Sequence, residues 1–533
     1  MAQFTLQQAI EHAEQLRSRG DFAQAEKIYR QILAQKPNQP FILNRLGICL
    51  GEAKRYADAI ELFHQAIALD PKYADAWANL SLARERSDDL DGAIDARRKA
   101  IELAGDSADA HHRLGTCLGK KGDFKSATEH LQLAIKLNPR VSGAYHDLQL
   151  ALVRAGNLDA AEEAAFRQIK NLSKVDADSL RPLADGLKSI GQFERATNLW
   201  KTAIAADPLC DEARGELAMC LITLGDYENG WRLYETRWDC GTFSENTRRD
   251  PNRQWGRDPV GKPDLAGRTI LIYSEQGIGD RIMFARYAAL LQQRDARVIV
   301  ECRWPIKSLL ESCTGVRLVY ATGETLPKYD WHIPMLSLPL AFETRLDTIP
   351  ANIPYLKAEP MRRERWGRRI AAAAPTHPSL RVGLTWAGNP RHKNDARRSI
   401  HPDFLAPLAE VQGTTFFSLQ KANENEKAAQ QPDRLELIDF TASFYDFADT
   451  AALIDHLDLV ICADTAVAHL AGAMGKEVWT LLPYVPDFRW GLVGDRTPWY
   501  PTMRLFRQSR PDDWEGVLQK VAQELKTRAP AQH

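Results

Sequence analysis

Three segments in the second half of the chain carry residues suited to binding a diphosphate. The first is Glu275-Gln-Gly-Ile-Gly-Asp280, which directly follows the apolar run Thr269–Tyr273. Gly277 and Gly279 would let the backbone approach a ligand closely. Asp280 stands at the start of the following helix, where it would face a ligand in a cleft or serve only as a helix cap.

The second segment is Ile461-Cys-Ala-Asp-Thr-Ala-Val-Ala-His-Leu-Ala-Gly-Ala-Met-Gly475. A buried strand would end at Asp464 and Thr465, and small residues then begin a helix whose free amides and positive dipole end suit a diphosphate. Asp464 could hold a ribose hydroxyl, and His469, one turn into the helix, could face the phosphate. The alternative is that Asp464 and Thr465 only cap the helix and that His469 is a packed core residue.

The third segment is basic. Between Arg362 and Arg398 the chain has ten Lys and Arg residues and two acids, Glu364 and Asp395. Its loop from Trp386 to Ser399 follows an apolar strand, and cations at the carboxyl end of a strand suit a pyrophosphate leaving group. A solvated surface role is the alternative for any single cation. The loop carries Trp386, Asn389, Lys393, Arg397 and Arg398.

Aromatic residues alternate with arginines in two later segments, Pro483–Trp490 and Trp499–Gln508. With Arg489, Arg504 and Arg507 they could stack a base or a sugar, or they could seal an interface between two lobes, which we favour. No metal site emerges, because the DxD-like triplet Asp176-Ala-Asp178 lies in the first half of the chain.

The elements that would position these segments are alternating strands and helices. Continuous apolar runs, typical of buried parallel strands, occupy 269–273, 298–301, 316–320, 381–386, 414–420, 457–462 and 477–482, with a further strand at 330–335. Helices are expected at 281–293, 449–456 and 514–525. This order predicts two Rossmann-like lobes, with 371–378 as the hinge and the ligand outside the carboxyl ends of the strands.

The first half of the chain follows a different rule, a period of 34 residues with one slip to 35. An aromatic residue or leucine is followed three residues later by alanine, as in Phe22/Ala25, Tyr56/Ala59 and Phe124/Ala127, and Pro37, Pro71 and Pro139 keep the same period. This pattern predicts a tetratricopeptide array of seven helical hairpins, which stack into a solenoid with a groove for extended polypeptide. The slip places an irregular hairpin near Asn171–Asp178, and the aromatic segment Tyr227–Trp238 would cap the array.

Composition narrows the function classes. The 533 residues carry a formal net charge of −1, which argues for neither nucleic acid nor a membrane surface as partner. We find no apolar run long enough for a transmembrane helix and no secretory signal in the acidic start MAQFTLQQAIEHAEQL. The eight cysteines form no CxxC pair, which fits reduced thiols and a cytoplasmic protein.

These residues resemble a bacterial family of tetratricopeptide proteins with a C-terminal GT-B glycosyltransferase domain related to the heptosyltransferases. The resemblance rests on EQGIGDRIMFARY, SLPLAF, WAGNPRHKNDARRS, FSLQ, DFADTAALI, DTAVAHLAGAMGKEVW and WYPTMRLFRQ. It implies that Asp280 is the general base and that Asp464, Thr465 and His469 hold the nucleotide-sugar donor. The family's phosphate-binding lysine corresponds to one of Lys393, Arg397 or Arg398.

Further donor contacts implied by the resemblance are Gly277, Gly279, Asn389 and Gln420, while Trp386, Arg489 and Trp490 are candidates for the acceptor side of the cleft. The layout is also similar to that of the O-linked N-acetylglucosamine transferases and the flagellin glycosyltransferases, in which an array recruits the protein acceptor. We therefore expect an inverting, metal-independent transferase acting on Ser or Thr of a protein such as flagellin, with no cofactor. The rivals are an inactive repeat scaffold and a cell-surface polysaccharide glycosyltransferase.

The expected domain organisation follows from these patterns. Residues 1–243 would form the array, 244–265 a Pro/Gly-rich connector, 266–370 the N-terminal lobe, and 371–533 the donor-binding C-terminal lobe with its final helix.

Overall fold

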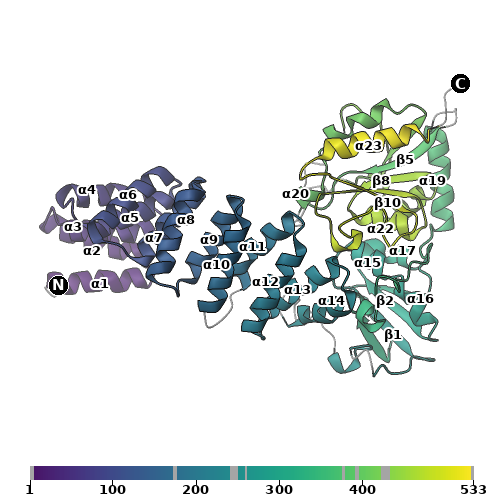
Figure 1. Cartoon of the computed structure of the whole chain (residues 1–533), viewed down its shortest axis with the longest axis horizontal. Coiled ribbons are helices and arrows are strands. Elements are labelled where there is room, and N and C mark those ends of the chain that lie inside the picture. Colours follow the sequence, from purple (N-terminus) through teal and green to yellow (C-terminus); the bar gives the residue numbers. More distant parts are fainter. Residues whose placement is uncertain are drawn as a thin grey trace. The chain divides into compact units, whose positions relative to one another are not determined.

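The computed structural model describes residues 5–171, 177–239, 250–257, 261–374, 379–390, 395–421 and 432–529. The chain divides into two compact units, one of Met1–Leu187 with Lys201–Cys210 and one of Lys188–Trp200 with Asp211–His533. Each unit has its own rule of construction, helical hairpins in the first and parallel sheets in the second (Figure 1). Among the described residues, no helix has the length and hydropathy needed to cross a bilayer.

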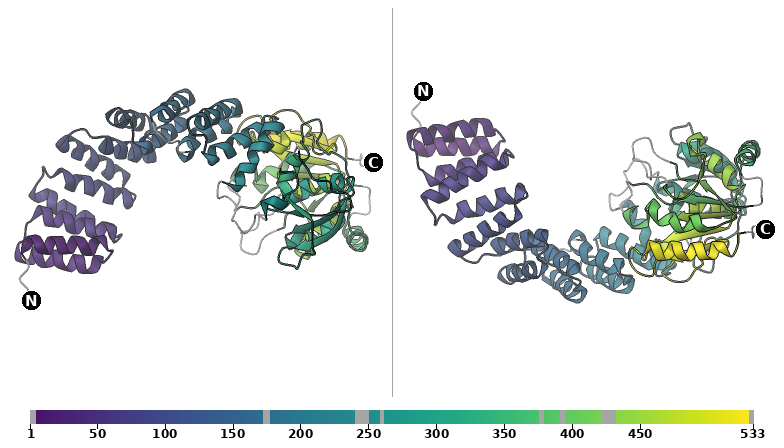
Figure 2. Two further views of the ribbon diagram at one scale, coloured as in Figure 1. Left: turned by 90° about the horizontal axis from the view of Figure 1, so that it is seen from below. Right: turned by 90° about the horizontal axis from the view of Figure 1, so that it is seen from above.

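The repeat helices pair as antiparallel hairpins, and the hairpins of the first unit stack in chain order (Figure 2). The bounds of these helices are α1 (Leu6–Ser18), α2 (Phe22–Gln35), α3 (Pro40–Glu52), α4 (Tyr56–Leu69), α5 (Ala74–Arg86), α6 (Leu90–Ala104), α7 (Ala108–Lys121), α8 (Phe124–Leu137), α9 (Ser142–Arg154), α10 (Leu158–Asn171), α11 (Ala177–Ser189), α12 (Phe193–Ala206), α13 (Asp211–Thr223) and α14 (Tyr227–Tyr234).

The helices confirm the tetratricopeptide array that the 34-residue period predicts. The periodic aromatic or leucine is the first residue of the second helix in each hairpin, as at Phe22 and Tyr56. The alanine three residues later is fully buried, as at Ala25 and Ala59. Close packing explains the small residues, since a Cβ added at Gly47 would lie 2.6 Å from the Phe63 ring. The irregular hairpin predicted near Asn171–Asp178 falls mostly on residues outside the described ranges.

The second unit contains two parallel sheets. The strands of the first have the order β3-β2-β1-β4 and those of the second have the order β10-β9-β8-β5-β6-β7. The strands are β1 (Thr269–Tyr273), β2 (Arg297–Cys302), β3 (Val316–Ala321), β4 (Trp331–Pro334), β5 (Leu380–Thr385), β6 (Thr414–Ser418), β7 (Ile438–Asp439), β8 (Leu459–Ala463), β9 (Val478–Leu482) and β10 (Met503–Arg507). Two parallel sheets of this kind are consistent with the expected GT-B fold.

Helices connect the strands. The α-helices are α15 (Ile278–Phe284), α16 (Tyr287–Gln292), α17 (Lys307–Leu310), α18 (Leu338–Ala341), α19 (Pro360–Ala373), α20 (Asp395–Arg398), α21 (Phe447–Ile454), α22 (Ala466–Ala473) and α23 (Trp514–Lys526). The 3₁₀ helices are η1 (Glu235–Trp238), η2 (Pro251–Arg253), η3 (Trp304–Ile306), η4 (Met335–Ser337), η5 (Pro402–Glu410), η6 (Thr441–Ser443) and η7 (Phe488–Trp490).

Two predicted elements differ from the observed ones. The helix expected over 281–293 is two helices, α15 and α16. The segment 371–378, predicted as a hinge, begins inside α19, whose basic residues are engaged by the acids of the helix α21 and its flanks. Arg362 pairs with Asp446 and Arg365 with Asp449, so these cations of the basic segment are structural.

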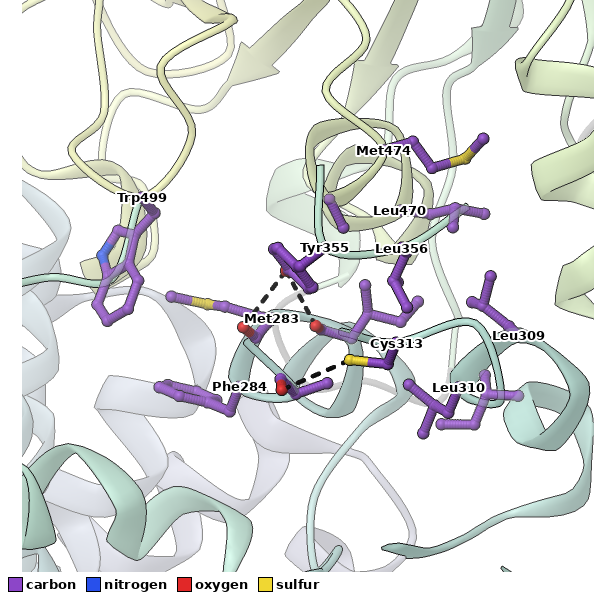
Figure 3. Packing of buried hydrophobic residues seen from close by; sticks show 14 of the residues in the cluster. Met283, Phe284, Leu309, Leu310, Cys313, Tyr355, Leu356, Leu470, Met474 and Trp499 are labelled. Atoms are coloured by element: carbon purple, nitrogen blue, oxygen red, sulfur yellow. Dashed lines mark hydrogen bonds between the residues drawn. The ribbon is translucent and has the colours of Figure 1, made fainter. Parts of the chain in front are cut away.

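The two sheets share one apolar core. Met283 and Phe284 of α15 lie in the same cluster as Leu470 of α22 (Figure 3). The backbone N–H of Tyr355 donates to the carbonyl oxygen of Ala473 over 2.9 Å, and its hydroxyl donates to that of Ile282 over 3.0 Å. A separate core lies under α23, which crosses the sheet of β5, β8 and β10 (Figure 1).

The last hairpin, α13–α14 with η1, belongs to the compact unit that contains both sheets. Trp231 is 2% exposed and packs edge-on against Phe284 of α15 and Phe488 of η7. Tyr227 stacks on Trp499 with ring centroids 6.2 Å apart. The aromatic segment predicted as a cap therefore covers side chains from both sheet-bearing lobes.

A buried ion network fixes the end of this hairpin. The Arg237 guanidinium pairs with Glu235 over 2.5 Å and with Glu275 over 3.2 Å, and it donates to the Ser337 hydroxyl over 2.8 Å. Glu275 also accepts from the backbone N–H groups of Met335 and Leu336. Burial raises the pKa of Glu275, and the Arg237 charge is the main effect that opposes this shift.

The described part of the connector packs on the first sheet. Trp255 is fully buried, its backbone N–H donates to the carbonyl oxygen of His332 over 2.9 Å, and its indole donates to that of Pro263 over 2.9 Å. Lys262 donates to the carbonyl oxygen of Ala341 over 2.7 Å.

We predict that a shortened chain beginning at residue 188 folds, whereas one beginning at residue 244 does not reach the same stability. The shorter chain loses the partners of Phe284, Phe488 and Trp499 and leaves Glu275 buried without Arg237. Breaking one buried ion pair typically costs about 3–5 kcal/mol. Thermal unfolding should show a cooperative transition for the longer chain and one lower by at least about 10 °C for the shorter. Equal melting temperatures would contradict this account.

Candidate active site

Both sheets have a switch point where strand order reverses, and the predicted site residues follow the strands on either side of it. In the first sheet the point lies between β1 and β4, and in the second it lies between β5 and β8. Ligands of open α/β sheets bind outside the carboxyl ends of strands at such points. The segments that follow β1, β5 and β8 are those predicted from the sequence.

Asp280, in the first turn of α15, has both carboxylate oxygens engaged. Oδ2 accepts from the backbone N–H of Gly277 over 3.1 Å, which caps the helix. Oδ1 accepts from Nη2 of Arg489, a residue that comes from the other lobe. The capping role therefore exists, and it occupies one of the two oxygens.

Arg489 lies in η7, after β9. Its Nη1 donates to Asp487 Oδ1 over 2.5 Å, and the guanidinium lies over the Phe488 ring. Its Nε–H is buried with no hydrogen-bond partner. Burial lowers the pKa of Arg489 to about 10, so the guanidinium is charged at neutral pH. One cation thus joins two carboxylates and retains a free donor.

Asp487 and Asp464 form an acidic pair beside this arginine. Burial raises the pKa of Asp487 to about 7, and the nearby Asp464 charge adds to the shift. Burial also raises the pKa of Asp464, which Trp490 and the Arg398 charge only partly offset. The sequence analysis missed Asp487, although its position two residues before Arg489 could have indicated an ion pair.

Thr465 occupies the N-cap position of α22, but its side chain makes no capping hydrogen bond. Its hydroxyl is buried without a partner. The simple capping interpretation of Thr465 does not describe this turn. An unpaired hydroxyl beside the first amides of a helix is suited to an anion.

His469 is buried and neutral. Its Nδ1 lies 3.0 Å from the Tyr500 hydroxyl, and its ring stacks on Trp490 with centroids 5.2 Å apart. Burial lowers the pKa of His469 to about 3, and the Arg286 and Arg398 charges add to this. A Cβ added at Gly279 would lie 2.9 Å from the His469 ring, so Gly279 permits α15 to approach α22. Donor contacts of Gly279 and His469 stay predictions.

The cations of the basic loop differ in their burial. Arg398 is partly buried and pairs with Asp395 over 3.3 Å, and its charge lowers the pKa values of Asp464, Asp487 and His469. Arg397 is exposed on the same short helix. Lys393 lies outside the described residues, whereas Asn389 lies within them, in the loop after β5. Of these two arginines, Arg398 is the one whose charge affects the acidic pair.

Other residues predicted from the sequence make structural contacts around the site. Gln420 Oε1 accepts from the Thr385 hydroxyl over 2.8 Å and from the backbone N–H of Ala387 over 3.0 Å, which fixes the start of the loop after β5. Trp386 is buried in the core under α23. Arg507 donates to the carbonyl oxygens of Trp490, Gly491, Val493 and Gly494, and Arg504 pairs with Glu524.

A second buried arginine, Arg286, was not predicted. It donates to the carbonyl oxygens of Met283 over 2.8 Å and Trp499 over 2.6 Å and to the Tyr355 hydroxyl over 3.2 Å. Within the described ranges, no group of three or more His, Cys, Asp or Glu side chains is arranged to hold a metal ion.

Comparison with known proteins gives matches in both parts of the chain. The family described as glycosyltransferase family 9 (heptosyltransferase) matches residues 405–514, and tetratricopeptide repeat families match 10–73, 44–110, 108–141 and 182–235. Protein FlbA of Caulobacter vibrioides is 25% identical over 339 residues, which are 58% of this chain and 54% of FlbA. The chain thus spans about half the length of that curated relative.

Solved structures match part of the chain. A crystal structure of MamA protein is 29% identical over 31% of this chain and 89% of its own, with a TM-score of 0.29. A structure of YrrB, titled a TPR protein with an unusual peptide-binding site, is 20% identical over 35% of this chain and 95% of its own, with a TM-score of 0.30. The C-terminal part of a TPR repeat-containing protein from Cytophaga hutchinsonii is 15% identical over 44% of this chain and 97% of its own, with a TM-score of 0.36.

The glycosyltransferase match runs from η5 to the first residue of α23, and it therefore includes Asp464, Asp487 and Arg489. The repeat matches lie between α1 and the first residue of η1. The chain carries tetratricopeptide repeats followed by a C-terminal glycosyltransferase family 9 domain.

Proposed function

We propose that this chain is an inverting, metal-independent glycosyltransferase that moves a sugar from a nucleotide-sugar donor to Ser or Thr of a protein bound by its repeats. The observation that carries the proposal is the contact of Asp280, after β1, with Arg489 of the family 9 domain. A carboxylate able to accept a proton and a cation able to hold a diphosphate thereby share one place, next to the unpaired Thr465 hydroxyl at the start of α22.

In the proposed reaction Asp280 accepts the proton of the acceptor hydroxyl. The hydroxyl oxygen attacks the anomeric carbon from the face opposite the diphosphate, a new C–O bond forms, and the bond to the diphosphate oxygen breaks with inversion. Arg398, Arg489 and the first amides of α22 stabilise the negative charge that develops on the leaving diphosphate. Since these groups supply positive charge, we expect transfer to continue in the presence of EDTA.

The repeats support a protein acceptor, because stacked helical hairpins present a long continuous surface to extended polypeptide. Flagellin is one candidate, since the layout resembles that of flagellin glycosyltransferases. The direct test is to incubate the full chain with its co-purifying proteins and a panel of nucleotide sugars and to measure intact masses. A sugar increment on a protein supports the proposal, whereas nucleotide binding with no increment favours a scaffold and transfer to glycans alone favours polysaccharide synthesis.

The first prediction concerns Asp280. The variant Asp280→Asn keeps the size and capping ability of the side chain but cannot take up a proton. Transfer should fall by about 10²–10⁴-fold, while nucleoside diphosphate binding is not weakened. Steady-state rates and calorimetric titration measure the two effects. Turnover near that of the unmodified chain would reduce Asp280 to a helix cap.

A second prediction separates the two arginines of α20. Because the Arg398 charge reaches Asp464 and Asp487, Arg398→Ala should weaken nucleoside diphosphate binding by about tenfold or more. The exposed Arg397 provides the matched control, and Arg397→Ala should bind nearly as the unmodified chain does. Binding of the corresponding nucleoside should stay unchanged in both variants. Equal loss of nucleoside and diphosphate affinity would indicate damage to the fold.

A third prediction tests the role of the repeats in acceptor recruitment. The chain beginning at residue 188 keeps α13, α14 and η1, so its site stays supported. We expect it to hydrolyse donor slowly or bind nucleotide as the full chain does but to lose glycosylation of the protein target. Assays at equal concentration of both chains provide the comparison. Undiminished glycosylation of the target would exclude the repeats as the acceptor-binding element.

A further inference from the structure

We infer that Arg489 is shared between Asp280 and the donor, so that a bound diphosphate draws the guanidinium away from Asp280 and makes that carboxylate available as the base. This inference rests on the proposed function and adds a regulatory step to the same site. It assigns Arg489 a role in coupling donor binding to base availability, which neither its sequence position nor the family match defines.

The geometry favours sharing because each Asp280 oxygen already accepts a hydrogen bond. One accepts from the Gly277 N–H as part of the helix start, and the other accepts from Arg489. An oxygen that accepts a charge-assisted hydrogen bond from a guanidinium is a weak proton acceptor. Release of Oδ1 from Arg489 would therefore make Asp280 the better acceptor for the proton of an acceptor hydroxyl.

The guanidinium has a reason to move when a diphosphate enters. Its Nη1 and Nη2 each bind a carboxylate, and its Nε–H is buried without a partner. A phosphate oxygen can satisfy this unpaired donor and present two oxygens to the planar fork. The diphosphate carries more negative charge than either carboxylate, so it competes with both Asp280 and Asp487.

The acidic pair allows Asp487 to give up its partner. The charged groups that face Asp487 are Asp464, Arg398 and Arg489. Burial and the Asp464 charge raise the pKa of Asp487 to about 7, so this carboxyl can take up a proton near neutral pH once the guanidinium leaves. Below pH 7 the protonated Asp487 holds Arg489 less strongly, and the arginine is more available to an anion.

The alternative is that Arg489 is a fixed brace between the lobes. Phe488, which the guanidinium covers, packs against Trp231, and this packing would persist in either role. A brace contributes to stability but does not compete for a ligand. The two roles therefore differ in how the partners of Arg489 affect anion binding.

The experiment uses the full chain and inorganic pyrophosphate as the probe, with affinities from calorimetry. Arg489→Gln should weaken binding by about ten- to a hundredfold. Asp280→Asn should strengthen it by about three- to tenfold, because a competitor for the guanidinium is removed. In the double variant the gain from Asp280→Asn should shrink or vanish. The matched control is Arg504→Gln, which removes a surface pair with Glu524 and should leave the affinity unchanged.

The pH dependence provides a second readout. We compare the ratio of the pyrophosphate affinity at pH 6 to that at pH 8 in two proteins. This ratio should be larger for the unmodified chain than for Asp487→Asn. The ionisation of pyrophosphate itself affects both proteins equally and therefore drops out of the comparison. A reduced melting temperature of Arg489→Gln with unchanged affinity would establish the brace and overturn the inference. So would unchanged affinity in Asp280→Asn, which carries the test alone if Arg489→Gln does not fold.

The outcomes also separate this inference from the proposed function. Sugar transfer that depends on Asp280, together with pyrophosphate binding that is indifferent to Arg489, would refute only the sharing of the arginine. Failure of the unmodified chain to bind pyrophosphate or any nucleoside diphosphate would refute both.

Discussion

The ion network around Arg237 is the interaction on which the arrangement of the site depends. Glu275 lies in the turn that leads to Asp280, and its carboxylate is completely buried. A buried carboxylate without a partner costs several kcal/mol, on the order of 3–5 when an existing pair is broken. Arg237, at the end of the last hairpin, and the N–H groups of Met335 and Leu336 provide its partners. The end of the repeats is thus a structural part of the turn that carries Asp280.

The contact between the two lobes also depends on a buried charge, but here the partners are carbonyl oxygens and aromatic side chains. Arg286 is buried without any carboxylate among the partners described for it, and it donates instead to the carbonyl oxygens of Met283 and Trp499 and to the Tyr355 hydroxyl. Tyr355 and Tyr500 surround the guanidinium with aromatic faces, at 5.0 and 4.5 Å from the ring centroids. Satisfying a buried cation from both lobes fixes how α15 meets α22 and therefore where Asp280 meets Arg489.

The sequence predicted local and periodic features better than contacts across the fold. The repeat period located the start of the second helix in each hairpin, since each periodic aromatic residue or leucine must enter the same packing layer. Strand ends located the segments of the site. The Asp280–Arg489 contact joins residues 209 positions apart, and no local pattern encodes it. The strand β10 was read as an aromatic segment, because Arg504 and Arg507 interrupt its apolar run for structural reasons.

In the function proposed above, two arginines together, rather than a single dedicated residue, would supply the positive charge that faces the diphosphate. Three carboxylates, Asp280, Asp464 and Asp487, are associated with two arginines, Arg398 and Arg489. Asp280 and Asp487 hold the Arg489 guanidinium in place, and the raised pKa values of Asp464 and Asp487 make protonation of these two carboxyls easier. In the proposed reaction, an arriving diphosphate would meet cations that are already in position, and protons taken up by the carboxylates would reduce the cost of displacing them.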